Sequence, residues 1–172
     1  FRFRESGIKS TVIKIQNHMN HLFEHNLTTR KIFLSLIDQL TVDELNLIPE
    51  GFRNNIIWNI VHSITAQQGL VYGLSGLEKS VTKELADKYG NGTTPDSKVS
   101  KEQIEEYKIM LVDLVEKTKA DYENGVFKEF KEYTTSTGYT MRNVEEALSM
   151  NNIHEGIHLG YALAIRKAIK SN

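Results

Sequence analysis

Apolar residues recur every three or four positions along most of this chain, a spacing typical of amphipathic helices that pack into a bundle. The pattern predicts four long helices, over about residues 20–40, 53–75, 100–122 and 140–169. The fold class expected from the pattern is therefore all-α, a four-helix bundle.

The connections between these helices are of unequal length. Thr41 with Glu44 forms a capping box, which predicts a short helix directly after the first long one. The stretch 76–99 is a long crossover connection with a short helix near 81–89, and connections of this length within a domain are often functional. Ser100 with Gln103 forms a second capping box at the start of the third long helix. Residues 126–139 are rich in β-branched side chains and are expected to be extended.

The first 18 residues lack the helical periodicity seen from Met19 onward. Residues 1–18 are interpreted as a leader or an N-terminal extension, and residues 19–172 as a single helical domain. A chain of 172 residues is long enough to bury a core of its own.

Composition removes several classes of function. The chain has no cysteine, which excludes disulfides, thiolate metal ligands and a cysteine nucleophile, and nothing in it indicates an oxidising compartment. Twenty-one basic and 22 acidic residues are interspersed, so no basic stripe is available to bind nucleic acid. No apolar run approaches the roughly 20 residues that cross a bilayer, and no signal peptide is evident. We expect a cytoplasmic protein that does not bind nucleic acid or membranes.

The last predicted helix contains an unusual break in its apolar seam. Its 3-4-3-4 pattern is made by Val144, Ala147, Asn151, His154, His158, Tyr161, Ile165 and Ala168. Three consecutive members are polar, and burying them without partners would cost a few kcal/mol in total. The seam therefore requires either a hydrogen-bond network or a bound ion at Asn151, His154 and His158.

The histidine spacing suits a metal ion. Residues at positions i and i+4 of a helix lie on one face with Cβ atoms roughly 6 Å apart, so the His154 and His158 rings can converge on one ion. His62 holds a comparable position on the second helix, where it is either a third ligand or a hydrogen-bonded structural residue. His18, His21 and His25 also share a potential face, but a frayed helix end rarely preorganises ligands.

The segment from His154 to His158 also matches the His-Glu-x-x-His motif of zinc metalloproteases, in which the glutamate activates a water. Those enzymes need a third ligand downstream, and the chain has no His, Asp or Glu after His158. A protease is therefore disfavoured. Glu155 stays a candidate catalytic residue, either as the general base of a metal-assisted hydrolysis or as a proton acceptor beside the metal.

Three segments together resemble the DinB-like (DinB/YfiT) family. They are the start of the first helix from Met19 to Asn26, the segment Trp58-Asn59-Ile60-Val61-His62, and His154-x3-His158 followed by Leu159-Gly160-Tyr161. The resemblance implies a four-helix bundle with a long crossover, in which His62, His154 and His158 bind one divalent metal, nickel or zinc. Residues 1–18 have no counterpart in the family, and Glu155 gives this chain its likeness to a zinc protease.

The resemblance also implies several possible functions. Characterised relatives include transferases and isomerases that use low-molecular-weight thiols, so the leading hypothesis is a metal-dependent thiol S-transferase acting on small electrophiles. The alternatives are a non-catalytic metal-binding or stress-response protein and a metal-assisted hydrolase. A small-molecule substrate and a homodimer would fit the family. Trp58, Tyr72 and Tyr161 either line a pocket beside the metal or belong to the ordinary core.

Overall fold

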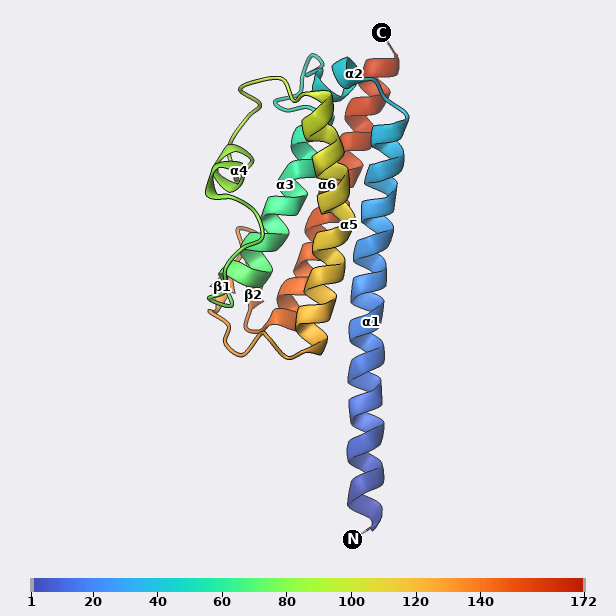
Figure 1. Ribbon diagram of the computed structural model, residues 1–172, viewed down its shortest axis with the longest axis vertical. Helices are drawn as coiled ribbons and strands as arrows, with labels where there is room; N and C mark the ends of the chain where they lie inside the picture. The colour runs from blue at the N-terminus through green and yellow to red at the C-terminus, as the bar shows by residue number, and fades with distance from the viewer. Residues whose placement is uncertain (1, 172) are drawn as a thin grey trace.

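The computed structural model of the chain describes residues 2–171, and the side chains of residues 19–171. Four long helices dominate it (Figure 1). The elements in chain order are α1 (Arg2–Asp38), α2 (Val42–Asn46), α3 (Ile56–Gln67), a π-helix η1 (Gln68–Gly73), α4 (Lys83–Lys88), α5 (Lys101–Glu123), β1 (Tyr133–Thr134), β2 (Thr140–Met141) and α6 (Val144–Lys170). The prediction of an all-α protein is confirmed.

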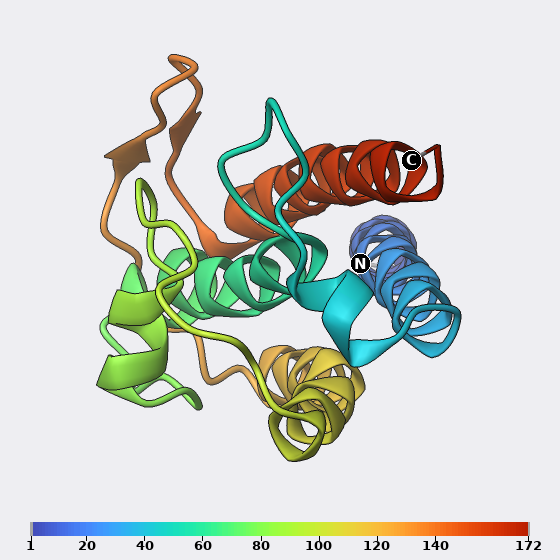
Figure 2. The same ribbon diagram turned by 90° about the horizontal axis from the view of Figure 1, so that it is seen from above.

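The four long helices form a bundle with a crossover. Helices α1 and α6 run in one direction and α3 and α5 in the other (Figure 1). Seen from above, α1 and α3 occupy opposite corners, and each contacts both α5 and α6 (Figure 2). Because α3 and α5 are parallel, the connection between them must return along the whole length of the bundle. Residues 74–100, which include α4, make this crossover.

Local sequence signals explain most helix ends. Both predicted capping boxes form, at Thr41 for α2 and at Ser100 for α5. Asn55 begins α3 by accepting a hydrogen bond from the amide of Trp58, and Asn143 begins α6 in the same way. The chain therefore enters α3, α5 and α6 at positions fixed by side-chain caps.

Helix α1 corrects the first predicted boundary. It begins at Arg2 and not near residue 20. Its N-terminal part extends past the ends of the other long helices (Figure 1). A helix without neighbours does not need an apolar stripe, which explains why this segment lacks the periodicity of a bundle helix. The interpretation of residues 1–18 as a leader or extension stays a prediction.

The second and fourth predicted helices also differ from the structure. The predicted helix over 53–75 is divided into α3 and η1. In η1 the backbone hydrogen bonds join residues five apart instead of four, as from the amide of Leu74 to the carbonyl of Gly69. Helix α6 begins at Val144 and not at 140, because Thr140 and Met141 pair with β1 instead. Within the predicted extended stretch 126–139, only Tyr133–Thr134 forms a strand.

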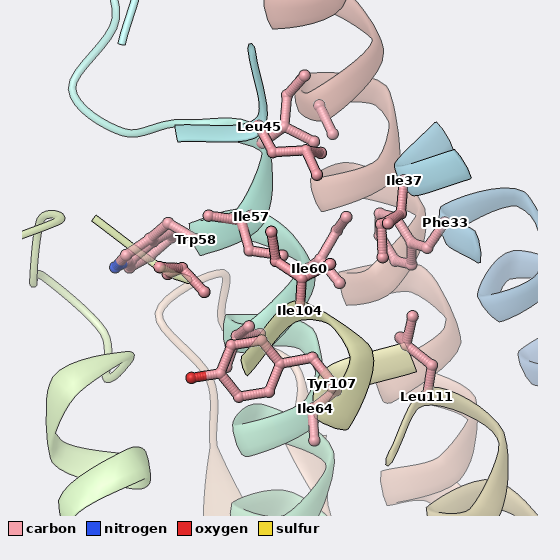
Figure 3. Close-up of a cluster of buried hydrophobic side chains, with 14 of the residues drawn as sticks. Phe33, Ile37, Leu45, Ile57, Trp58, Ile60, Ile64, Ile104, Tyr107 and Leu111 are labelled. Atoms are coloured by element: carbon pink, nitrogen blue, oxygen red, sulfur yellow. The ribbon is translucent and has the colours of Figure 1, made fainter. Parts of the chain in front are cut away.

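The apolar core consists of two clusters. The larger one joins all four long helices around buried residues such as Phe33, Ile60, Ile64 and Leu111 (Figure 3). The smaller one lies toward the η1 end of the bundle and includes Met19, Phe23, Val71, Tyr72, Val115, Val144 and Leu148. Helix α3 packs against α4, α5 and α6, and nearly all its residues are buried.

Buried polar residues separate the two clusters along α1, α3 and α6. We call this set the polar layer. Its members, each no more than 2% exposed, are Asn26, Arg30, Ser63, Gln67, Asn151 and Glu155. Fully buried charges are rare unless they are paired, so this layer needs an explanation in terms of contacts.

Within the described residues, none of the helices has the length and apolar character that a bilayer crossing requires.

Candidate metal centre

Three histidines from two helices meet at one side of α3. One ring nitrogen from each of His62, His154 and His158 lies within 4.8 Å of the other two. The closest pair is Nε2 of His62 and Nε2 of His154, at 3.3 Å. Nitrogens bonded to one ion at about 2.1 Å would lie about this far apart. The structure therefore brings together the three residues that the sequence singled out.

The histidines do not lie on the buried seam of α6 as the sequence pattern predicted. The buried line of this helix keeps Asn151 and Ile165 of the predicted seam, but between them it runs through Glu155 and Ala162, each one position after a predicted member. His154 and His158 are half-buried, and Tyr161 is 40% exposed. This shift places the histidines at the edge of the core, where their rings reach both α3 and solvent-accessible space.

His62 is held in one orientation by its surroundings. Its Nδ1 lies 2.7 Å from the carbonyl oxygen of Tyr89, which can only accept a hydrogen bond. The proton of a neutral ring must therefore sit on Nδ1, which leaves Nε2 with a free lone pair. The indole of Trp58 stacks on the imidazole, with ring centres 4.7 Å apart and planes within 7° of parallel. Both contacts fix the ring before any ion arrives.

His158 is also oriented by a hydrogen bond at Nδ1, but its partner is a side chain. Its Nδ1 lies 2.9 Å from Oδ1 of Asn59. The amide of Asn59 is itself fixed, because its Nδ2 donates to the carbonyl of Asn55 at 2.8 Å. Nδ1 of His158 is therefore the protonated nitrogen, and Nε2 is free. Hydrogen bonds of this kind set the tautomer of metal-binding histidines and raise their basicity.

His154 differs from the other two. Its buried Nδ1 has no hydrogen-bond partner within the described part of the chain. Without an ion, its Nε2–H can donate to the lone pair on Nε2 of His62. Binding a metal through Nε2 would move that proton to Nδ1. His154 is thus the least preorganised of the three nitrogen ligands.

Burial keeps the three rings neutral. It lowers the pKa of His62 below the ordinary value. Burial and the neighbouring His62 lower the pKa of His154 to about 4, and burial with the other two histidines lowers the pKa of His158 to about 3. Metals bind neutral imidazole, so at neutral pH no proton has to be displaced from the cluster.

The cluster opens into a cavity of about 810 Å³. This volume lies within the roughly 300–1,000 Å³ of small-molecule sites. α3, η1 and α6 form its floor, residues 90–93 of the crossover form one wall, and residues 133–137 form another. None of the described residues that line the cavity is Asp or Glu, whereas Arg53 and Lys79 both contribute to it.

The crossover connection is part of the site, in line with its unusual length. Tyr89 gives its carbonyl to His62, and Thr93 accepts a hydrogen bond from Nε1 of Trp58 at 3.1 Å. Tyr161 lines the cavity, Trp58 both lines it and belongs to the larger core cluster, and Tyr72 belongs to the smaller core cluster. His21 and His25 are exposed on α1, away from the cluster.

Glu155 lies in the polar layer and not with the histidines. Its side chain is fully buried and bound at both oxygens by Arg30, with Nε to Oε2 at 2.8 Å and Nη2 to Oε1 at 2.7 Å. Asn151 donates to Oε1 as well, at 2.8 Å. Its carboxylate is therefore committed to a structural ion pair. The sequence pattern suggested a catalytic base, and the geometry gives that role no support.

Sequence reasoning did not identify three residues that shape the site, namely Arg30, Asn59 and Tyr89. Asn59 and Tyr89 act on the histidines through hydrogen bonds from a side chain and a backbone carbonyl. No spacing rule reveals such contacts. Arg30 could have been found, because it follows Asn26 by four positions and precedes Phe33 by three on one helical line.

The family comparison agrees with this geometry. The model of the DinB superfamily matches residues 25–162, which is more than half of the chain and includes all three histidines. The chain belongs to the DinB superfamily. None of the curated proteins compared with it matches significantly. The family assignment and the histidine cluster are together compatible with metal binding, as the DinB-like resemblance implied.

The residues present fit a divalent ion such as nickel or zinc. The donor set is three neutral imidazoles, which suit both metals. Three protein ligands also leave coordination positions free, as in catalytic sites and unlike closed structural ones. The free positions would face the cavity, since the histidines line it.

Proposed function

We propose that this DinB superfamily protein binds one nickel or zinc ion through His62, His154 and His158 and catalyses transfer of a low-molecular-weight thiol to a small electrophile. The observation that carries the proposal is the convergence of three neutral imidazoles on one side of a ligand-sized cavity. A purely structural site would be closed by a fourth side chain, and a cavity would have no role there.

The reaction needs a sulfur nucleophile at neutral pH. The thiol loses its proton, sulfur forms a bond with the electrophilic carbon, and the leaving group departs with the electron pair of the bond that breaks. The thiol proton is released to solvent, and a leaving group such as chloride departs as its anion. A divalent ion at an open site supplies the missing acidity by lowering the pKa of a thiol that approaches it.

The protein holds the histidine rings in place and surrounds the reacting atoms with a partly apolar wall. The hydrogen bonds from His62 to Tyr89 and from His158 to Asn59 hold two rings in place, so little reorganisation accompanies binding. The apolar part of the cavity wall, which includes Ala66, Leu70 and Met150, limits the water around the reacting atoms. Glu155 does not enter this proposal, because Arg30 already holds its carboxylate.

Thiol consumption tests the proposal. Protein loaded with nickel or zinc would be mixed with a panel of low-molecular-weight thiols and an aryl chloride, and loss of free thiol would be followed. We expect turnover by wild type, loss of at least about 100-fold in His158→Ala, and no change in His25→Ala, an exposed histidine outside the site. Equal rates in wild type and His158→Ala would contradict the proposal.

A second candidate is a non-catalytic metal-binding protein. The observation that favours it is that the cluster joins α3 to α6, so an ion would link two helices of the bundle. It predicts a large fall in melting temperature on chelation and no turnover with any thiol. The two candidates are therefore separated by the same assay.

A further inference from the structure

The cavity beside the histidines has two ends of different character. Toward η1 it is lined by Ala66, Gly69, Leu70, Leu74 and Met150, which are small or apolar, and by the cationic Lys79. Toward the start of α3 it is lined by Arg53, Asn54, Trp58, Asn91, Thr93 and Tyr161, which are mostly polar. The histidines lie between these ends, since His62 falls between Trp58 and Ala66 on α3.

The polar end has hydrogen-bonding groups without protein partners. Arg53 is exposed and has no carboxylate within 4 Å among residues 19–171. The neighbouring Asn54 is half-buried, and its buried Oδ1 has no partner among the same residues. Thr93 is different, because its hydroxyl already bonds Trp58, Lys88 and Gly90. The unpartnered atom of Asn54 is an acceptor, so Arg53 is the donor at this end that is available to an anionic ligand.

The positive charge of the cavity lining favours an anionic ligand. Twenty-two acidic residues are spread through the chain, yet none of the described ones lines the cavity. The charged side chains that do line it are Arg53 and Lys79, both cationic. An anion approaching Arg53 meets no repulsive carboxylate in the lining, and a guanidinium can bind a carboxylate through two parallel hydrogen bonds.

We propose that the polar end of the cavity is a subsite for the carboxylate of an acidic thiol, with Arg53 as its partner. The apolar end then takes the body of the electrophile. This assignment rests on the proposed function for the identity of the reactants. The recognition of a carboxylate at Arg53 can nevertheless be measured without turnover.

The single tryptophan of the chain makes that measurement direct. Trp58 lines the cavity and stacks on His62, so its fluorescence reports what binds there. N-acetylcysteine and N-acetylcysteine amide differ only in the carboxylate, and each would be titrated into zinc-loaded protein. We expect the acid to bind about fivefold more tightly than the amide, as one ion pair of up to about 1 kcal/mol allows.

Two matched variants complete the test. Arg53→Gln removes the cation at the polar end and should make the two affinities equal. Lys79→Gln removes the cation at the apolar end and should preserve the preference for the acid. Equal affinities in wild type, or no binding of either compound up to its solubility limit, would overturn the proposal, as would a preference that survives Arg53→Gln.

The same titration separates this proposal from the proposed function. A preference for the acid that disappears in Arg53→Gln supports the subsite even if no thiol is consumed with any electrophile. Thiol turnover without any such preference supports the enzyme and overturns the subsite.

Discussion

Two adjacent residues of α6, His154 and Glu155, face two polar regions that the protein treats in opposite ways. Glu155 enters the polar layer, where both its oxygens are bound by Arg30 and one by Asn151. His154 enters the histidine cluster, where its Nδ1 has no partner among the described residues and its Nε2 faces another nitrogen. In the polar layer the two opposite charges are paired with each other, and Nδ2 of Asn26, Nη1 of Arg30 and Oδ1 of Asn151 have no partner among the described residues. The histidine cluster contains three neutral imidazoles and is compatible with a bound metal ion.

The difference shows how structural polar groups in a core can be distinguished from candidate functional ones. Buried charges that are paired specify how helices fit together, and Arg30 links α1 to Glu155 of α6 and to the carbonyl of Ser63 on α3, at 3.3 Å. The three neutral imidazoles have one hydrogen bond among them, between Nε2 of His154 and Nε2 of His62, and they border the cavity. This is why the histidines and not Glu155 are the candidates for function.

The largest expected effect comes from breaking the ion pair. Either Glu155→Ala or Arg30→Ala leaves an unpaired charge in a fully buried position and should lower the free energy of unfolding by about 3–5 kcal/mol. Chemical denaturation of the metal-free protein measures this. The double variant Arg30→Met/Glu155→Leu removes both charges and should recover more than half of the loss, because an apolar pair of similar volume packs without desolvation cost.

A general base at Glu155 predicts a different outcome. In that case Glu155→Gln would keep its fold and abolish activity while the metal stays bound. If single removal of either charge changed stability by less than 1 kcal/mol, the polar layer would not have the role described here.

The next effect concerns Asn59, which orients His158. Asn59→Ala removes the acceptor for Nδ1 of His158 and should weaken metal binding by about 10–100-fold. Asn59→Asp keeps the acceptor for His158 but loses the donor to the Asn55 carbonyl, so it should retain only part of the affinity. Ser63→Ala, one turn along α3 and bonded to a backbone carbonyl and not to a histidine, should leave the affinity unchanged. Competition with a chromogenic chelator gives the affinities, and an equal loss in Ser63→Ala would show that the effect is general destabilisation.

The smallest effect is on the pH dependence of the metal-free protein. Burial lowers the pKa of His62, His154 and His158 in the folded state, to about 4 and about 3 for the latter two. Below the unfolded pKa of about 6.5, the unfolded chain binds protons that the folded chain does not, so stability falls as the pH falls. The loss continues until the folded rings protonate.

Thermal unfolding between pH 7 and 5 measures this dependence. The melting temperature of metal-free wild type should decrease over this range, and the decrease should be smaller in His154→Ala/His158→Ala. His25→Ala provides the control, because that histidine is exposed. An identical decrease in all three proteins would mean that the cluster does not impede protonation.

The sequence predicted the bundle and the histidines for clear physical reasons. Periodicity located the four long helices, and side-chain caps at Thr41 and Ser100 located two helix starts. The spacing of His154 and His158 predicted convergence on one face, and the position of His62 on the second helix made it a candidate third ligand. The family resemblance implied all three as ligands of one metal. These features are local along one helix or are carried by short motifs.

The parts that could not be predicted depend on contacts between distant segments. The buried line of α6 passes through Glu155 because Arg30, 125 positions away, neutralises it. A pattern that scores glutamate as polar places it outside and shifts the predicted seam to the histidines. The backbone carbonyl of Tyr89 could not have been predicted either, since every residue has one and only the path of the crossover brings this one to His62.

The most direct test of the account is the metal content of protein purified without a nickel column, measured by mass spectrometry. Wild type, His62→Ala, His154→Ala/His158→Ala and Arg30→Met/Glu155→Leu would be compared. The account predicts about one nickel or zinc ion per chain in wild type, none in the two histidine variants, and an ion retained in the variant of the polar layer. Wild type that contains no metal and takes up neither nickel nor zinc when supplied would contradict it, because the three histidines would then be a hydrogen-bonded cluster only.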